Sequence, residues 1–212
     1  LAEVVCDKLR LDNKKPNNEN WEKMINKIKN IKDEFVTVAI VGKYVQLEDS
    51  YLSVIESLKH GGFANDIKVK IDLIDSESIT NKNVNKILSK YDGIIVPGGF
   101  GTRGTEGKLE TIKYARENDV PFLGICLGMQ MAVIEFARNV ANLEDANSEE
   151  LDKNCKNPVI HIMEDQKDIH KKGGTMRLGA YPCVLKEGSL AEKIYGKKEI
   201  SERHRHRYEF NN

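Results

Sequence analysis

The stretch VPFLGICLGMQMAVIEFA, residues 120–137, changes its hydrophobic pattern at one cysteine, Cys126, which stands between two glycines. Before the cysteine the apolar residues run together, as in a strand. After it the apolar residues continue in a helical pattern. The stretch therefore predicts a strand that turns into a helix at Cys126, the unit from which parallel α/β sheets are built.

The residues upstream repeat this alternation of strand and helix. Apolar runs predict strands at 35–42, 68–75 and 93–99, and the segments between and after them predict helices at 51–63, 84–91 and 109–118. We expect the first of these helices to stop at Gly61 and Gly62. The alternation predicts an α/β fold with an open, flavodoxin-like, mostly parallel sheet and helices on both faces.

The two ends of the sequence differ from this pattern. Short apolar runs in VIHIME, TMRLGAYPCVL and SERHRHRYEF predict a small antiparallel part in the C-terminal half. Residues 1–34 are polar and rich in Lys and Asn, with apolar positions at helical spacing over 21–31, which predicts one surface helix behind the linker PNNEN. We expect a domain boundary between residues 34 and 35.

Composition narrows the class of protein. The 212 residues hold 33 basic and 33 acidic side chains, so a formal charge of zero gives no overall attraction to nucleic acid or to an anionic membrane. No apolar segment approaches the length of a membrane span, and no signal-peptide pattern opens the sequence. The four cysteines are far apart and form no CxxC pair, so we expect free thiols rather than disulfides or zinc. A cytoplasmic protein is the resulting expectation.

The pattern G-I-C-L-G resembles a nucleophile elbow, in which glycines flank a residue in strained backbone geometry at a strand-to-helix turn. A thiol at the start of a helix meets unpaired N–H groups and the positive end of the helix dipole, so we expect its pKa to be lowered. The alternative is a buried structural cysteine, because cysteine is among the most buried residue types. The short pattern alone leaves both readings open.

A second glycine-rich segment, VPGGFGTRG at 96–104, follows the strand that we expect beside the Cys126 strand. Acyl transfer through a thiolate needs N–H donors for the developing oxyanion, and the backbone N–H groups of Gly99 and Leu127 are the candidates. A phosphate-binding glycine loop is the alternative, but the segment has neither a Walker lysine nor a G-x-G-x-x-G spacing that opens into a helix.

Together these segments resemble the glutamine amidotransferase domain of CTP synthases, a class I, or triad, amidotransferase family. The resemblance covers nearly the whole sequence and rests on VGKYVQLEDSYLSVIESLKHGGF, VPGGFGTRGTEGK, PFLGICLGMQMAVIEFARNV, GGTMRLG and ERHRHRYEFNN. It implies hydrolysis of glutamine through a cysteinyl thioester and delivery of ammonia for the ATP-dependent amination of UTP to CTP. It also implies that residues 1–34 are the end of a synthetase half and its linker, and that 35–212 are the amidotransferase domain.

The resemblance assigns roles by position. Cys126 stands at the nucleophile's place. The positions that correspond to glutamine contacts are Gly98, Gly99, Phe100, Leu127, Gln130, Glu150 and Arg207. Glu149 adjoins Glu150, so the register of that carboxylate is open by one residue. Because an amino-acid substrate presents a fixed cation and a fixed anion, a carboxylate and an arginine are suitable partners for it.

The resemblance also implies cofactors and partners for the whole protein. GTP activates family members, and Arg205 with Phe100 is a candidate edge of that effector site. A nucleic-acid patch is the alternative for RHRHR, but no aromatic pair is interleaved in it. No cofactor is expected in this domain, whereas the full-length enzyme is expected to use ATP and Mg and to form a homotetramer.

One feature of the family pattern is missing from these residues. The family completes its triad with a His-Pro-Glu motif a few dozen residues beyond RHRHRYE, and the 212 residues contain none. His204 and His206 with Glu209 do not have the spacing of that motif, so we do not assign them to the triad. If the polypeptide ended at Asn212, we would expect glutaminase activity to be absent or very weak, because ammonia needs a proton to leave.

Three other interpretations of the sequence are alternatives to a CTP synthase glutaminase domain. Another triad amidotransferase or a γ-glutamyl hydrolase shares the cysteine elbow. A catalytically incompetent regulatory module that binds glutamine or GTP fits the missing motif. A flavodoxin-like binding domain with a structural cysteine fits the fold alone.

Overall fold

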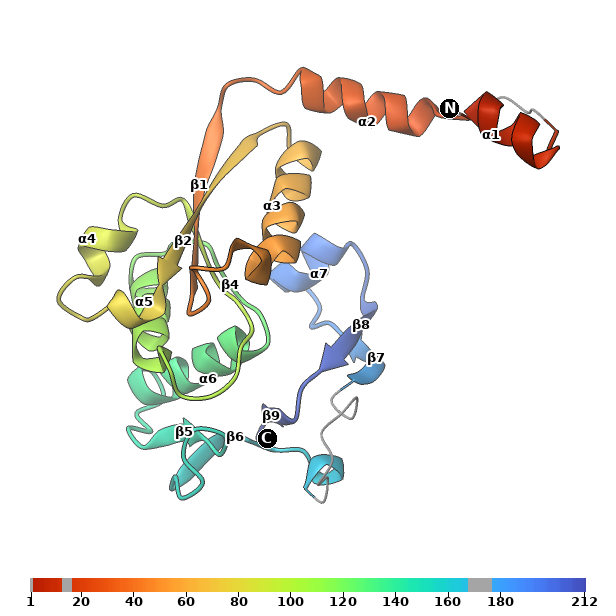
Figure 1. The fold of residues 1–212 in the computed structure, drawn as a ribbon. Coiled ribbons are helices and arrows are strands. Elements are labelled where there is room, and N and C mark those ends of the chain that lie inside the picture. The colour runs from red at the N-terminus through yellow and green to blue at the C-terminus, as the bar shows by residue number, and fades with distance from the viewer. Residues whose placement is uncertain (1, 13–16, 168–176) are drawn as a thin grey trace.

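The central sheet is parallel throughout. The computed structural model describes residues 2–12, 17–167 and 177–212, and its main sheet has four strands in the order β2-β1-β3-β4 (Figure 1). The strands are β1 (Phe35–Gly42), β2 (Lys68–Asp75), β3 (Gly93–Val96) and β4 (Phe122–Gly124). Every neighbouring pair is parallel, so the carboxyl ends of all four strands meet at one edge.

Helices cover both faces of this sheet, which confirms the predicted architecture (Figure 1). On one face lies α3 (Leu52–Ala64), and on the other lie α4 (Val84–Leu88), α5 (Thr105–Glu117) and α6 (Leu127–Asn139). Along β1, Val38 and Ile40 pack in the cluster that includes α3, whereas Ala39 and Val41 pack toward α5 and α6. Because both faces of β1 are buried, its sequence is a continuous apolar run.

The predicted end of the helix at residues 51–63 was wrong, because α3 runs through Gly61 and Gly62 to Ala64. A side chain at Gly62 would place its Cβ 2.6 Å from the carbonyl oxygen of Ile67. Gly62 therefore allows the chain to fold back closely over the helix rather than stopping it. Short 3-10 helices follow β1 and β2, at Glu48–Tyr51 and Ser76–Ser78.

The C-terminal half contains the small antiparallel part that the sequence predicts. β5 (Ala146–Ser148) pairs in parallel with β6 (Asn157–Ile162), which pairs antiparallel with β9 (Tyr208–Phe210). β7 (Arg177–Val184) and β8 (Glu199–Arg205) form a separate antiparallel pair. A 3-10 turn lies at Glu164–Gln166, and α7 (Leu190–Tyr195) lies between β7 and β8. Part of the GGTMRLG segment lies outside the described residues.

The N-terminal helices extend away from the sheet (Figure 1). They are α1 (Ala2–Leu9) and α2 (Glu19–Lys29), and the second confirms the predicted surface helix. Lys27 on α2 donates from Nζ to the carbonyl oxygen of Ala64 at 2.8 Å, while Trp21 stays 65% exposed. Part of PNNEN lies outside the described residues. Within the described ranges, no helix is long and apolar enough to cross a membrane.

Candidate active site

Cys126 lies at a strained turn between β4 and α6. Its backbone has φ 54° and ψ −109°, a left-handed value of φ that residues with a side chain rarely adopt. Glycines make the turn possible, because a Cβ at Gly128 would lie 1.9 Å from the carbonyl oxygen of Val96 and one at Gly124 would lie 2.6 Å from the Gly128 backbone. The strained elbow predicted from G-I-C-L-G is confirmed.

The loop after β3 passes directly beside this cysteine. A Cβ at Gly98 would lie 3.3 Å from Cys126 Cβ and 3.9 Å from its Sγ. The N–H of Leu127, the residue after Cys126, acts to lower the pKa of the thiol, and the N–H of Gly99 has no backbone acceptor among the described residues. Gly99 lines the same cavity as Cys126, and Leu127 is the residue that follows the cysteine.

One cavity of about 340 Å³ collects most of the residues that the resemblance singles out. It is lined by Gly99, Phe100, Cys126, Gln130, Glu150, His206, Arg207 and Tyr208. Gly98 and Leu127 do not line it but adjoin Cys126. Residues from the loop after β3, from α6, from the turn after β5 and from the segment before β9 therefore meet at the carboxyl edge of the sheet.

The two adjacent carboxylates have different neighbours. Glu150 lines the cavity, and its Oε1 accepts the N–H of Gly101 at 3.1 Å. Glu149 instead turns its Oε2 to the N–H of Ile162 at 2.9 Å, where it closes a strand end. Of the two, Glu150 is the one placed to meet a ligand in the cavity.

Two further polar side chains join the C-terminal segment to the elbow helix and the cavity. Gln130 Nε2 donates to the carbonyl oxygen of Tyr208 at 3.0 Å, which ties β9 to α6. Arg207 Nη2 donates to the carbonyl oxygen of Gln166 at 2.9 Å, while its buried Nε has no hydrogen-bond partner in the part of the chain that the structure describes. Arg207 also lines the cavity, where a guanidinium is a suitable partner for an anionic group.

Burial raises the pKa of the Cys126 thiol, so the predicted lowering by the helix start was wrong. The N–H of Leu127 and the charge of Arg205 act to lower it, and the carboxylate of Glu150 adds to the rise. Removal of water from the thiolate outweighs the helix terminus in this setting.

The family comparison agrees with this geometry. The family described as "Glutamine amidotransferase class-I" matches residues 46–212. The chain belongs to the class I glutamine amidotransferases. Curated relatives include the CTP synthases of Clostridium acetobutylicum and Methanocaldococcus jannaschii, which are 57% identical over 212 residues and 56% identical over 217 residues. Each alignment takes in 100% of this chain but only 39% and 40% of the relative, so the chain spans about two fifths of their length.

A solved structure narrows the family further. The Trypanosoma brucei CTPS glutaminase domain with bound acivicin matches with a TM-score of 0.75 and 43% identity, over 83% of this chain and 68% of that one. The resemblance of this amidotransferase to the glutaminase domain of CTP synthases is thereby confirmed.

Sequence reasoning missed two residues of the amidotransferase cavity, Tyr208 and His206. The backbone carbonyl group of Tyr208 accepts from Gln130, a contact that no residue pattern reveals. His206 has a buried Nδ1 without a hydrogen-bond partner in the described ranges, and burial lowers the pKa of its imidazole. The carboxylate of Glu209 lies 3.7 Å from His161 instead. No carboxylate is hydrogen-bonded to His206 among the described residues, as a triad histidine would require.

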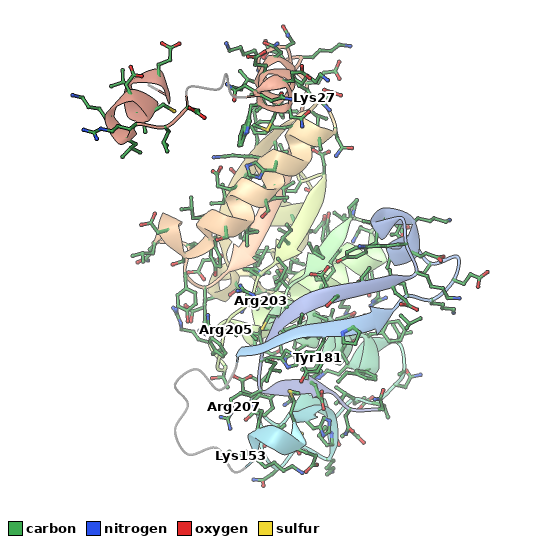
Figure 2. All side chains as sticks on the ribbon, turned by 90° about the vertical axis from the view of Figure 1, so that its right-hand side faces the viewer. Lys27, Lys153, Tyr181, Arg203, Arg205 and Arg207 are labelled. Atoms are coloured by element: carbon green, nitrogen blue, oxygen red, sulfur yellow. The ribbon has the colours of Figure 1, made fainter. Side chains whose placement is uncertain are left out.

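A second cavity of about 770 Å³ adjoins the first at Cys126 and Gln130. Arg203 and Arg205 line it from β8, and Figure 2 shows them with Arg207 along the segment that leads into β9. His204 lies between Tyr181 and His206, with ring centroids 5.1 Å and 5.3 Å away. Within the described residues, no group of three His, Cys, Asp or Glu side chains could hold a metal ion.

Proposed function

We propose that this domain hydrolyses glutamine to glutamate and ammonia. The Cys126 thiolate attacks the side-chain amide carbon, forming a carbon–sulfur bond while the carbonyl oxygen takes the negative charge. The carbon–nitrogen bond then breaks, and ammonia leaves with the proton that the thiol gave up when the thiolate formed. Water attacks the resulting thioester, which releases glutamate and returns the thiol.

The observation that carries this proposal is the meeting of Cys126, Glu150 and Arg207 in one cavity. The N–H groups of Gly99 and Leu127 would stabilise the oxyanion. The carboxylate of Glu150 would bind the substrate ammonium and the Arg207 guanidinium would bind the substrate carboxylate, both as charge-assisted hydrogen bonds. Phe100 and Gln130 would complete the walls of the glutamine site, and Gly98 would support it from beside Cys126.

The remaining part of the proposal concerns the full-length protein, and its support is the likeness to CTP synthases over about two fifths of their length. The ammonia would aminate UTP to CTP with ATP and Mg at a synthetase site, in a ligase of pyrimidine biosynthesis. Residues 1–34 would be the end of that synthetase half and its linker. A homotetramer in the cytoplasm belongs to the same proposal, and the free state of all four cysteines supports that compartment.

GTP activation is a further part of the same proposal. Phe100 is 52% exposed at the cavity, and the exposed Arg205 lies in the adjoining cavity. An aromatic ring and a guanidinium are suitable partners for a purine nucleotide. The test is the ratio of glutamine hydrolysis with and without GTP, which Arg205→Ala should lower; an unchanged ratio contradicts the assignment.

Acivicin, the glutamine analogue named with the trypanosomal domain, tests the proposed function directly. The full-length protein is the sample, because the His-Pro-Glu motif that the resemblance implies is not among these 212 residues. We expect one adduct by intact mass, mapped to Cys126 and prevented by glutamine. Cys155 is a matched control, since it is a half-buried thiol outside the cavity. A protein that binds glutamine without labelling at Cys126 would be a regulatory module instead.

A further inference from the structure

Lys108 is an unusual residue for the helix position that it occupies. It lies in the first turns of α5, and its side chain is only 1% exposed. Among the residues that the structure describes, no carboxylate forms an ion pair with it, and Glu77 and Glu135 pair instead with Arg103 and Arg116. A cation near the N-terminus of a helix also opposes the helix dipole. Burial, the dipole and the lack of a carboxylate partner all disfavour a lysine here.

The ammonium of Lys108 lies close to Gly99, in the loop between β3 and α5 that would supply an oxyanion donor. A Cβ at Gly99 would lie 3.9 Å from Lys108 Nζ, 3.7 Å from Lys43 Cε and 3.5 Å from Leu127 Cδ2. The neighbouring Gly98 turns the equivalent side toward Cys126. The loop is therefore enclosed between the thiol on one side and two lysine side chains on the other.

Lys43 and Glu150 hold the next peptide of this loop from both ends. Lys43 donates from Nζ to the carbonyl oxygen of Phe100, and the N–H of the same peptide, that of Gly101, donates to Glu150 Oε1 at 3.1 Å. Arg103 supports Lys43 by donating to its carbonyl oxygen at 3.2 Å. These contacts fix Phe100 and Gly101, but they leave Gly99 without a polar tether of its own in the described part of the chain.

Electrostatics give Lys108 a different character from its neighbours. Burial lowers the pKa of its ammonium to about 8, and the positive charges of Lys43 and Arg103 add to this effect. Lys43 and Lys108 thus both lie against Gly99 in the loop after β3. A residue that is unfavourable in several respects at once, as Lys108 is by its burial and by its place in the helix dipole, is typical of a functional site.

We propose that Lys108 is a positioning residue of the proposed glutaminase: its side chain packs against Gly99, which limits the movement of the loop, and its positive charge favours the negative charge that develops on the oxyanion. The inference rests on the proposed function. It explains the cost of burying an ammonium without a carboxylate partner by a role in catalysis rather than in folding.

The test variant is Lys108→Met in the full-length protein, with Lys113→Met on the same helix as the matched control. We expect kcat for glutamine hydrolysis to fall about tenfold or more, less than the loss of a direct oxyanion donor, while KM changes less than about threefold. We expect Tm to rise by a few degrees, because an apolar side chain replaces a buried charge without a carboxylate partner. Lys113→Met should change neither kcat nor KM.

Two thiol reagents separate the oxyanion from the nucleophile. An aldehyde analogue of glutamine adds to the Cys126 thiol, so that a carbon–sulfur bond forms and the aldehyde oxygen takes the oxyanion position. Iodoacetamide alkylates the thiolate by displacement of iodide and needs no oxyanion site. Lys108→Met should weaken binding of the aldehyde about tenfold while the rate of alkylation stays within about twofold of the wild type.

The outcomes distinguish this inference from the proposed function. If the wild-type protein neither hydrolyses glutamine nor binds the aldehyde, the proposed function is wrong. If the wild type does both and Lys108→Met retains the same kcat and aldehyde affinity, the inference about Lys108 is wrong. A lower Tm together with slower alkylation would also overturn it, because Lys108 would then serve the fold.

Discussion

At the scale of single residues, the charges around Cys126 predict two opposite effects of one substitution. Burial is the main cause of the raised thiol pKa, and the Glu150 carboxylate adds to it. Glu150→Gln removes that negative charge, so the thiol pKa should fall and alkylation by iodoacetamide near pH 8 should become faster. The same change should raise KM for glutamine about tenfold to a hundredfold, because a charge-assisted bond to the substrate ammonium is lost.

Glu149→Gln is the matched control for this prediction. Glu149 adjoins Glu150 but accepts the N–H of Ile162, away from the cavity. The Glu149→Gln variant should therefore leave the pH profile of alkylation and the KM for glutamine unchanged. A rise in KM with Glu149→Gln, and none with Glu150→Gln, would reverse the assignment of the two carboxylates.

A catalytic residue can be predicted from sequence when its residue type and the flanking residues that fix its backbone conformation occur together. Cys126 between two glycines could be predicted as an elbow, and its positive φ confirms it. The thiol pKa could not, because it depends on how much surrounding chain excludes water from the sulfur. Lys108 was not foreseen for a related reason: hydrophobic patterning assigns lysine to the surface, and only the packed structure shows it buried behind Gly99.

At the scale of elements, the contact between α6 and β3 holds the elbow in place. Gly128 allows this contact, since its Cβ would overlap the Val96 carbonyl oxygen at 1.9 Å. Gly128→Ala should cost about 1–3 kcal/mol in the free energy of unfolding, which lowers Tm by about 3–10 °C. It should also displace Cys126 and reduce labelling by acivicin. Thermal unfolding followed by circular dichroism measures the first effect and intact mass the second.

Gly61→Ala provides the control, because nothing lies within 4 Å of the position of its Cβ in α3. Alanine favours a helix over glycine by about 1 kcal/mol, so this variant should be at least as stable as the wild type. Equal Tm values for the two variants would show that the approach of α6 to β3 does not depend on Gly128.

The alternation of strands and helices could be predicted because each element carries its own hydrophobic period. β1 and β2 keep the predicted bounds at 35–42 and 68–75. The end of α3 was misjudged, because a Gly-Gly pair can serve a close approach as well as a helix end. α5 begins at Thr105 rather than near residue 109. Hydrophobic periodicity missed this start, because the first turn of the helix contains Gly107 and lacks an apolar residue.

At the scale of the whole molecule, the cavity depends on contacts between distant segments. Gln130 on α6 and the carbonyl group of Tyr208 are 78 residues apart in sequence. Glu150 reaches the loop after β3 across 49 residues. These contacts depend on the order of the strands in the sheet, which no local sequence pattern reveals. The site residues could therefore be predicted as one group only from the family resemblance and not from hydrophobic periodicity.

Cys126 is proposed to act as a covalent catalyst, and one measurement tests this role most directly. The full-length protein is mixed with glutamine, quenched in acid within its first turnovers, and analysed by intact mass and peptide mapping. We predict a glutamyl thioester on Cys126 that forms before glutamate accumulates and is absent from Cys126→Ala. Release of glutamate and ammonia at an undiminished rate by Cys126→Ala, or a glutamyl adduct on another cysteine, would contradict the account.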